Sequence, residues 1–183
     1  MGDRVLVTLT GGAGAGKTTL AGALAASASG APALVLHGDD YYFTTPERGV
    51  WAADGAGVPR LDVGDPRSVD VERLGRDAAA AFTEADVVVV EGLFARHLDP
   101  PVACPRLDVF VDLPADLRLA RKIQRKCLGE GFPLDVLLRN YLDHRRDAHE
   151  RHVEPLRHDC DIVVDGALDP GVLARRIWSA ATR

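Results

Sequence analysis

The sequence is poor in cysteine and has no long apolar run. Its three cysteines are an odd number without the spacing of a metal site, which favours free buried thiols in a reducing cytoplasm. No apolar run approaches the roughly 18–20 residues of a membrane span, so we expect no membrane association. The first residues, MGDRVLVTLTGG, lack the apolar core of a signal peptide. These absences together predict a cytoplasmic protein.

Positive charge is also in deficit, and lysine is scarce. The chain has 22 basic residues against 27 acidic ones, for a net charge of −5, and only Lys17, Lys122 and Lys126 are lysines. This balance argues against a protein dedicated to binding nucleic acid. The basic residues gather in one segment, residues 118–151, within an otherwise acidic chain. Such a segment is either a solvated helical face or a surface for an anionic ligand.

What the chain does have is a regular succession of strand-like and helical segments. Its length predicts one domain over residues 1–183. Five short apolar runs without alternation are typical of strands buried on both faces: Val5–Leu9, Ala33–His37, Val87–Val90, Leu107–Val111 and Ile162–Val164. The helical patterns lie at Thr18–Ser29, Val69–Phe82, Asp116–Leu128, Leu134–Leu156 and Pro170–Thr182. This alternation predicts an α/β fold with a mostly parallel sheet.

The stretch Thr44–Gly64 fits no regular element, because it contains three clusters of proline and glycine. A loop this long in a compact domain is usually functional or disordered. We interpret it as part of a substrate loop at approximately residues 39–70, with a merely mobile loop as the alternative. Just after it, Asp65 or Ser68 could cap the next helix, or Asp65 could bind a polyhydroxylated substrate.

The first predicted strand runs into a match to G-x-x-x-x-G-K-[ST], placed between a strand and a helix. Glycines let backbone N–H groups converge on a phosphate chain without Cβ clashes, and the helix N-terminus adds the positive end of its dipole. Lys17 is expected to reach the β and γ phosphates, and the Thr18 hydroxyl to ligate Mg²⁺. The motif predicts nucleotide binding by Gly11, Gly12, Ala13, Gly14, Ala15, Gly16, Lys17, Thr18 and Thr19.

Acidic residues follow three of the predicted strands. Ligands of open α/β sheets lie beyond the carboxyl ends of the strands, where a carboxylate can hold Mg²⁺ or take a proton from a hydroxyl. Asp39 or Asp40 follows the second strand and Glu91 ends the third, and for these we favour a catalytic interpretation over a plain turn. For Asp112, after the fourth strand, we favour a helix cap before Pro114.

The cationic segment places its charges at helical spacing. An arginine supplied to the moving phosphoryl group can raise the rate by about 10³–10⁵, and a closing lid excludes water. Because a phosphate loop lies upstream, we interpret approximately residues 118–151 as a catalytic lid. His149 has no companions for a tetrahedral metal site and is interpreted as a polar or substrate-facing residue. The basic residues of the segment include Arg118, Arg121, Lys122, Arg125, Lys126, Arg145, Arg146 and Arg151.

In order along the chain, these segments resemble the uridine kinase-like family of P-loop small-molecule kinases, whose relatives include phosphoribulokinase, pantothenate kinase and nicotinamide riboside kinase. The resemblance covers nearly the whole chain. It implies a P-loop NTPase fold, with a five-stranded parallel sheet in the order 2-3-1-4-5, flanking helices and a small helical lid. The stretches that carry it are GGAGAGKTT, GDDYYF, GDPRSVD, VVVVEGLF, LDVFVDLPADLRLARKIQR and YLDHRRDAHERHVEPLRHDCDIVV.

The resemblance also implies roles for single residues. It makes Asp39 the base that deprotonates the acceptor hydroxyl, and it places Thr18 and Glu91 around Mg²⁺. It makes Lys122 and Arg125 the lid cations that contact the phosphates. The acceptor contacts assigned in addition to Asp39 are Tyr42, Asp65, Arg146 and His149. The aromatic residues Tyr41, Tyr42, Phe43 and Trp51 either stack on a base or anchor the substrate loop.

Two departures from the family bear on the acceptor. The hairpin of animal-type uridine kinases has no room between Phe82 and Val87, and Phe132 stands where the family has a substrate-contacting arginine. Both argue against uridine itself, whereas nicotinamide riboside kinases share the short connection. The sequence therefore predicts an enzyme that uses ATP and Mg²⁺ to phosphorylate a hydroxyl of a small, nucleoside-like metabolite. A nucleotide kinase with a phosphate acceptor and a non-catalytic ATP-binding regulatory module stay open as alternatives.

Overall fold

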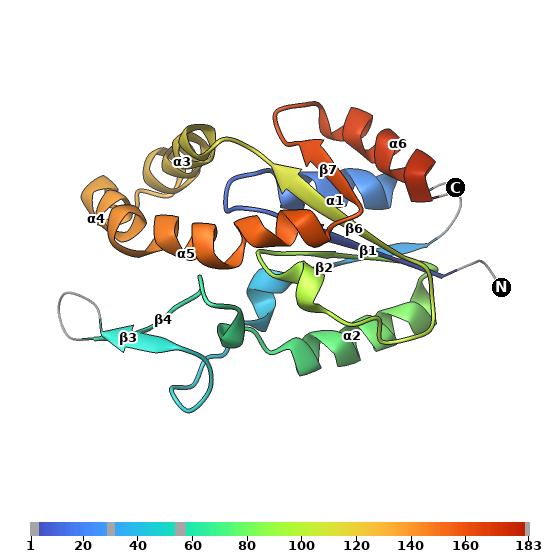
Figure 1. Cartoon of the computed structure of the whole chain (residues 1–183), viewed down its shortest axis with the longest axis horizontal. Coiled ribbons are helices and arrows are strands. Elements are labelled where there is room, and N and C mark those ends of the chain that lie inside the picture. Colours follow the sequence, from blue (N-terminus) through green and yellow to red (C-terminus); the bar gives the residue numbers. More distant parts are fainter. Residues whose placement is uncertain (1–3, 29–31, 54–57, 182–183) are drawn as a thin grey trace.

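The computed structural model describes residues 4–28, 32–53 and 58–181. Its centre is a five-stranded parallel sheet in the order β2-β5-β1-β6-β7 (Figure 1). Counted along the chain as first to fifth, these strands have the order 2-3-1-4-5, so the predicted fold is confirmed. Their bounds are β1 (Val5–Thr10), β2 (Ala33–His37), β5 (Val87–Glu91), β6 (Arg106–Asp112) and β7 (Ile162–Asp165).

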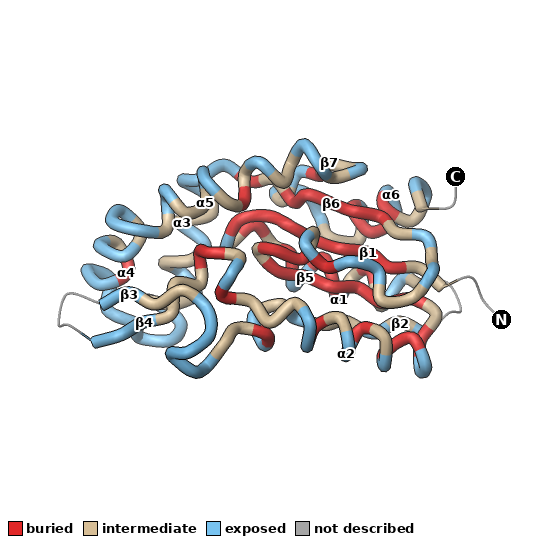
Figure 2. The backbone as a smooth tube through the Cα atoms, turned by 60° about the horizontal axis from the view of Figure 1, so that its bottom comes forward, coloured by how far each residue is buried: buried red, intermediate tan, exposed pale blue. Residues whose placement is uncertain are grey.

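Helices cover both faces of the sheet. Helices α1 (Lys17–Ala26) and α6 (Pro170–Ala181) pack on one face, and α2 (Val71–Glu84) packs on the other. Along β5, Val87 and Val89 contact the α1 and α6 layer, while Val88 and Val90 contact the α2 layer. Because both faces are buried, the strands have unbroken apolar sequences, and Figure 2 shows the sheet strands as the largest buried part of the chain.

The ends of the predicted helices need small corrections. Residues Ser29 and Thr182, predicted as helix ends, lie outside the described residues. Neither Asp65 nor Ser68 caps α2: the cap is Asp70, whose carboxylate accepts a hydrogen bond from the backbone N–H of Arg73 at 3.0 Å. Asp65 instead caps the short 3-10 helix Pro66–Ser68, because it lies directly before the proline that starts that turn.

The two predicted lid helices are broken into shorter pieces. The first is α3 (Ala115–Ile123) with a π-helical continuation over Gln124–Gly129. The second is α4 (Leu134–Asn140), a π-helical stretch over Tyr141–Arg145, α5 (Arg146–His152), and a 3-10 helix over Glu154–Asp159. The predicted helix Leu134–Leu156 is too long because Pro155 has no N–H to continue α-helical hydrogen bonding. In Figure 1 these helices lie together at one end of the sheet.

The stretch Thr44–Gly64 is not wholly irregular, which corrects the sequence interpretation. It contains an antiparallel pair, β3 (Trp51–Ala53) and β4 (Pro59–Leu61), whose register aligns Trp51 with Leu61. Proline is tolerated in β4 because the pair has only edge strands. The residues that connect the two strands lie outside the described part of the chain. The pair projects from the same end of the sheet as the lid helices (Figure 1).

Two expectations from composition can be compared with the structure. The three cysteines are free, but Cys104, Cys127 and Cys160 are partly rather than fully buried. Within residues 4–28, 32–53 and 58–181, no helix has the length and apolar character needed to cross a membrane.

Candidate active site

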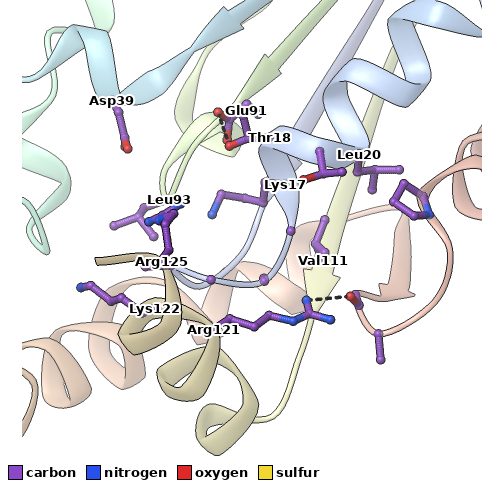
Figure 3. Close-up of a pocket in the computed structure, with 18 of the residues that line it drawn as sticks. Lys17, Thr18, Leu20, Asp39, Glu91, Leu93, Val111, Arg121, Lys122 and Arg125 are labelled. Carbon is purple, nitrogen blue, oxygen red and sulfur yellow. Dashed lines mark hydrogen bonds between the residues drawn. The ribbon is translucent and has the colours of Figure 1, made fainter. Parts of the chain in front are cut away.

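A cavity of about 870 Å³ lies at the carboxyl ends of the sheet strands. Its floor is the phosphate loop, and Asp39 and Tyr42 approach it after β2. Glu91 and Leu93 enter from the end of β5, the lid adds four basic residues, and the segment between β7 and α6 closes the remaining side. Figure 3 shows these side chains around one space. The position agrees with the rule that parallel sheets bind ligands beyond their carboxyl ends.

The phosphate loop has a backbone that only glycine can adopt. Gly14 and Gly16 have φ angles of 88° and 101°, in the left-handed region. A Cβ at Gly11 would lie 2.4 Å from the carbonyl oxygen of Val111, and a Cβ at Gly14 would lie 2.6 Å from the carbonyl oxygen of Arg118. The loop is therefore pressed against β6 and α3, with its open side toward the cavity. This is the geometry in which successive backbone N–H groups can cradle phosphate oxygens.

Lys17 is a buried cation with spare hydrogen-bonding capacity. Its residue is 8% exposed, and its ammonium donates to the carbonyl oxygen of Gly12 at 3.1 Å. Burial lowers the pKa of Lys17, while the negative charges of Glu91 and Asp39 raise it. An ammonium group has three donors, so this position suits an additional anionic partner in the cavity.

Thr18 and Glu91 lie side by side beneath the cavity. The Thr18 hydroxyl donates to the Oε1 atom of Glu91 at 3.0 Å, and His37 Nδ1 lies 2.9 Å from the same oxygen. Glu91 is 6% exposed. In the described part of the chain, no group of three or more His, Cys, Asp and Glu side chains could hold a metal by itself. The pair fits Mg²⁺ nevertheless, because Mg²⁺ is commonly held by one or two protein oxygens together with substrate phosphates.

Asp39 and Tyr42 line the opposite side of the cavity from the segment between β7 and α6. The Asp39 carboxylate points into the cavity (Figure 3), and no described residue forms a hydrogen bond or ion pair with it. The Tyr42 hydroxyl donates to the carbonyl oxygen of Val63 at 2.9 Å, and Tyr42 also lines the cavity. Burial raises the pKa of Tyr42, so its hydroxyl stays protonated at neutral pH.

The lid contributes a row of cations. Lys122 and Arg125 line the cavity as the sequence predicts, together with Arg121 and Lys126. Burial lowers the pKa of Lys122, and the positive charges of Arg145 and Arg125 lower it further. Lys126 pairs with Glu130, and Arg145 pairs with Asp62, whereas Lys122 and Arg125 form no ion pair with any described residue. Two neighbouring cations without an ion pair favour an anion between them, at a place above the phosphate loop.

Comparison with known proteins agrees with this geometry. Residues 62–169 match the model of the phosphoribulokinase/uridine kinase family. The chain belongs to this family. It is 27% identical to a uridine kinase of Staphylococcus epidermidis, over 90% of this chain and 88% of the relative, and 29% identical to a uridine kinase of Staphylococcus aureus, over 87% and 86%. The protein is accordingly an ATP-dependent small-molecule kinase, which sets aside the non-catalytic module.

Solved structures of other kinases share the fold. A gluconokinase from Sinorhizobium meliloti 1021 superposes with a TM-score of 0.61 at 20% identity, covering 98% of this chain and 93% of that one. The APS kinase of Mycobacterium tuberculosis, solved with AMPPNP and APS, superposes with a TM-score of 0.59 at 18% identity, covering 99% of each chain. At these identities the likeness concerns the fold alone.

Several residues predicted for the kinase site do not line its main cavity. The Asp65 carboxylate is bound by its neighbour Arg67 at 2.7 Å, and Arg146 pairs with Glu150 on the exposed side of α5. His149 lines a separate, smaller cavity. Local pairing explains the positions of Asp65 and Arg146, since each finds its partner within four residues, whereas His149 faces the smaller cavity and lies 3.3 Å from Glu154.

Two further interpretations are wrong or incomplete. Asp112 does not cap α3, because Pro114 occupies the cap position and Asp112 instead pairs with Arg157 at 2.9 Å. Of the aromatic residues near the substrate loop, Tyr42 alone lines the main cavity among the described residues. The Tyr41 hydroxyl donates to Asp77 at 3.0 Å, and the Trp51 indole donates to the carbonyl of Arg48 at 2.7 Å, so these two anchor the loop.

Three features of the kinase site were missed from the sequence. His37 contacts Glu91 across neighbouring strands, a contact set by the register of β2 on β5. Arg121 donates to the carbonyl oxygen of Gly166 at 3.0 Å and so joins the lid to the segment after β7. Arg118 lies directly against Gly12. The helical spacing of Arg118 and Arg121 indicated that they lie on one face of a helix. It could not indicate that Arg118 contacts the phosphate loop and that Arg121 contacts the segment after β7.

Proposed function

We propose that this kinase transfers the γ-phosphoryl group of Mg-ATP to a hydroxyl of a small metabolite, and that the acceptor is nucleoside-like. The observation that carries the proposal is the Asp39 carboxylate, which faces the cavity above the phosphate loop and has no described partner. A free carboxylate at this place can accept the proton of an attacking hydroxyl. A phosphate acceptor would need no such base and would be repelled by it, which disfavours the nucleotide-kinase alternative.

The chain's own residues account for the other requirements of phosphoryl transfer. The phosphate loop binds and aligns the triphosphate, and Lys17 stabilises negative charge at the β and γ phosphates. Lys122 and Arg125 supply positive charge from the lid side, where the leaving phosphates and the transferring group would lie. Closing the lid over the cavity would exclude water and so limit hydrolysis of ATP.

Thr18 and Glu91 are the residues that would hold Mg²⁺, the hydroxyl directly and the carboxylate directly or through water. The ion would neutralise charge on the β and γ phosphates. The contact between His37 and Glu91 keeps the Glu91 carboxylate beneath the cavity.

Three observations support a nucleoside-like acceptor. The curated relatives that match over most of the chain are uridine kinases. Tyr42 lines the cavity together with Asp39, so an aromatic ring is available where a sugar or base could pack. Helix α2 ends at Glu84 and β5 begins at Val87, so the short connection noted in the sequence is retained.

The test compares Asp39→Asn with Asp40→Asn. Asp40 is the matched control, since it is the next residue, also exposed, and does not line the cavity. ADP release is measured with Mg-ATP and a panel of nucleosides, pantothenate and simple sugars, and ATP affinity is measured by calorimetry. We expect Asp39→Asn to bind ATP normally and to lose at least about 10²-fold in kcat, the usual contribution of a general base. Retained turnover in Asp39→Asn would move the base elsewhere, and loss of turnover in Asp40→Asn would then identify Asp40 as the base.

A further inference from the structure

A second cavity of about 100 Å³ adjoins the main one beneath the lid. We refer to it as the annex. The two cavities share Ala13, Val63, Leu93 and Lys122 in their walls, so they are neighbours separated by a few side chains. Val63 is also the residue whose carbonyl accepts the hydrogen bond of Tyr42. The annex therefore adjoins the side of the main cavity on which the acceptor is proposed to bind.

Every described polar side chain that lines the annex can donate a hydrogen bond, and of these only Tyr141 and His149 can also accept one. Among the described residues that line it, none is a carboxylate, and the other walls are apolar, such as Leu119 and Val153. An anion or a group rich in carbonyl oxygens would satisfy these donors, whereas a cation would be repelled. The polar side chains are Arg118, Lys122, Tyr141, Arg145 and His149.

Nearby acids neutralise only part of this charge. Arg145 pairs with Asp62 at 2.9 Å, and His149 Nε2 lies 3.3 Å from Glu154, although neither acid lines the annex. Arg118 uses its Nε to donate to the carbonyl of Leu113 at 2.9 Å, and it has no ion pair within the described part of the chain.

The end of the Arg118 guanidinium thus lines the annex without an ion pair to any described residue. Burial lowers the pKa of Arg118, and the negative charges of Glu154 and Asp112, with which it forms no ion pair, oppose this only in part. Lys122 also lines the main cavity, where its ammonium would pair with the phosphates of the nucleotide. A guanidinium with free N–H groups forms two parallel hydrogen bonds to a carboxylate or phosphate, which few other groups can accept.

We propose that the annex binds an anionic oxygen group, a carboxylate or a phosphate, which the acceptor carries at a distance from the hydroxyl that is phosphorylated. This inference rests on the proposed function, because it assumes that the acceptor lies between Asp39 and the lid. It narrows the acceptor to acids and disfavours neutral or cationic molecules of the same shape. The small volume limits the bound group to a few heavy atoms.

The first test uses acceptors that share a ribose 5′-hydroxyl and differ in charge. Uridine is neutral, orotidine carries a carboxylate, uridine 3′-monophosphate carries a phosphate and nicotinamide riboside carries a positive ring. Pantothenate and its neutral alcohol form a second pair outside the nucleosides. We expect kcat/KM to be about 10- to 100-fold higher for the acid of a pair, as for a hydrogen bond to a charged group. Equal values of kcat/KM for uridine and orotidine, together with equal values for pantothenate and its neutral alcohol, would overturn the proposal. The better acceptor of orotidine and uridine 3′-monophosphate identifies which anionic group the annex binds.

The second test uses variants of the annex. Arg118→Gln should reduce the preference for the acid, measured as the ratio of kcat/KM for the acid to that for its neutral partner, at least about 10-fold, whatever its effect on kcat/KM for the neutral acceptor alone. Because Arg118 also packs on Gly12, the KM for ATP is measured in parallel, and Arg145→Gln serves as a second variant further from the phosphate loop. Arg151→Gln is the matched control, an exposed arginine of the same helical region that does not line the annex. An unchanged preference in both annex variants would contradict the proposal.

The ADP-release assay distinguishes failure of the proposed function from failure of the annex proposal. If the proposed function fails, no acceptor would release ADP, although ATP would still bind. The annex is then judged by saturation-transfer NMR of orotidine and uridine with the protein and AMPPNP. Binding of orotidine that exceeds that of uridine and is lost in Arg118→Gln supports the annex. Equal signals from the two nucleosides overturn it.

Discussion

Lys17 allows the sharpest prediction, because its charge should destabilise the fold in the absence of nucleotide and stabilise the transition state of phosphoryl transfer when the nucleotide is bound. Its ammonium has three donors, and one of them is used on the Gly12 carbonyl, which leaves two for phosphate oxygens. At about 1.5–3 kcal/mol for each charge-assisted hydrogen bond, two of them contribute about 3–6 kcal/mol to the transition state. Lys17→Met keeps the length of the side chain and should therefore lower kcat by about 10²- to 10⁴-fold.

The same substitution should stabilise the protein without ligand. Burial lowers the pKa of Lys17 from its ordinary value of 10.5, so the unfolded chain binds this proton more tightly than the folded one does. The charged lysine thus destabilises the fold at pH values below its lowered pKa, and this penalty disappears as the pH rises toward 10.5. Lys17→Met should raise the free energy of unfolding at neutral pH, and its advantage over the wild type should shrink at alkaline pH.

Coupled measurement of ADP release gives kcat, and urea unfolding between neutral and alkaline pH gives the free energies of unfolding. Lys126→Met is the control, since Lys126 lines the same cavity but is more exposed and already pairs with Glu130 at 2.6 Å. We expect the control to lose less than about 10-fold in kcat, because an exposed ion pair contributes only about 0–1 kcal/mol. Near wild-type turnover in Lys17→Met would refute the assignment of the phosphate loop. Lower stability of Lys17→Met at neutral pH would refute the argument about burial.

The remaining predictions concern the scaffold around the site. Gly14→Ala should cost about 1–3 kcal/mol of stability and weaken ATP binding, because the new Cβ would lie 2.6 Å from a backbone oxygen at a φ of 88°. Gly22→Ala, in α1 with nothing within 4 Å of the added Cβ, should instead gain about 0.5–1 kcal/mol, and equal effects of the two in urea unfolding would contradict this reasoning. Asp108→Asn should cost about 3–5 kcal/mol, since Asp108 is 5% exposed and pairs with Arg106 at 2.8 Å; a loss below about 1 kcal/mol would mean that the pair adds no net stability.

The parts of the fold that could be predicted are those that leave a local signal. The valines of β5 face both layers, so their sequence is apolar without interruption, and the strand could be placed from the sequence alone. The phosphate loop could be found because its glycines are required by backbone geometry at Gly14 and Gly16, whatever surrounds them. In both cases the physical requirement applies to consecutive residues.

The parts that could not be predicted depend on contacts between distant residues. The β3–β4 pair aligns Trp51 with Leu61 across a connection whose sequence is rich in glycine, and no periodic pattern in the sequence predicts this pairing. The position of Asp65 depends on whether Arg67 or a ligand takes the carboxylate, and residue type cannot decide between these. The annex is built from the phosphate loop, the segments after β4 and β5, and three lid segments, so it exists only in the folded chain.

The division of charge between sheet and lid explains why these distant contacts matter for a kinase. The acids that line the main cavity lie at the ends of sheet strands or after them, while the cations Lys122 and Arg125 come from the lid; these acids are Asp39, Glu91 and Asp169. Burial and neighbouring cations lower the pKa of Lys122, and the negative charge of Asp39 opposes them, so Asp39 and the lid attract each other across the cavity. A triphosphate placed between them would contact the lid cations through its own oxygens, and Mg²⁺ would offset its repulsion from the acids. We therefore propose that a bound nucleotide, which places negative charge between the lid cations and the phosphate loop, favours closure of the lid.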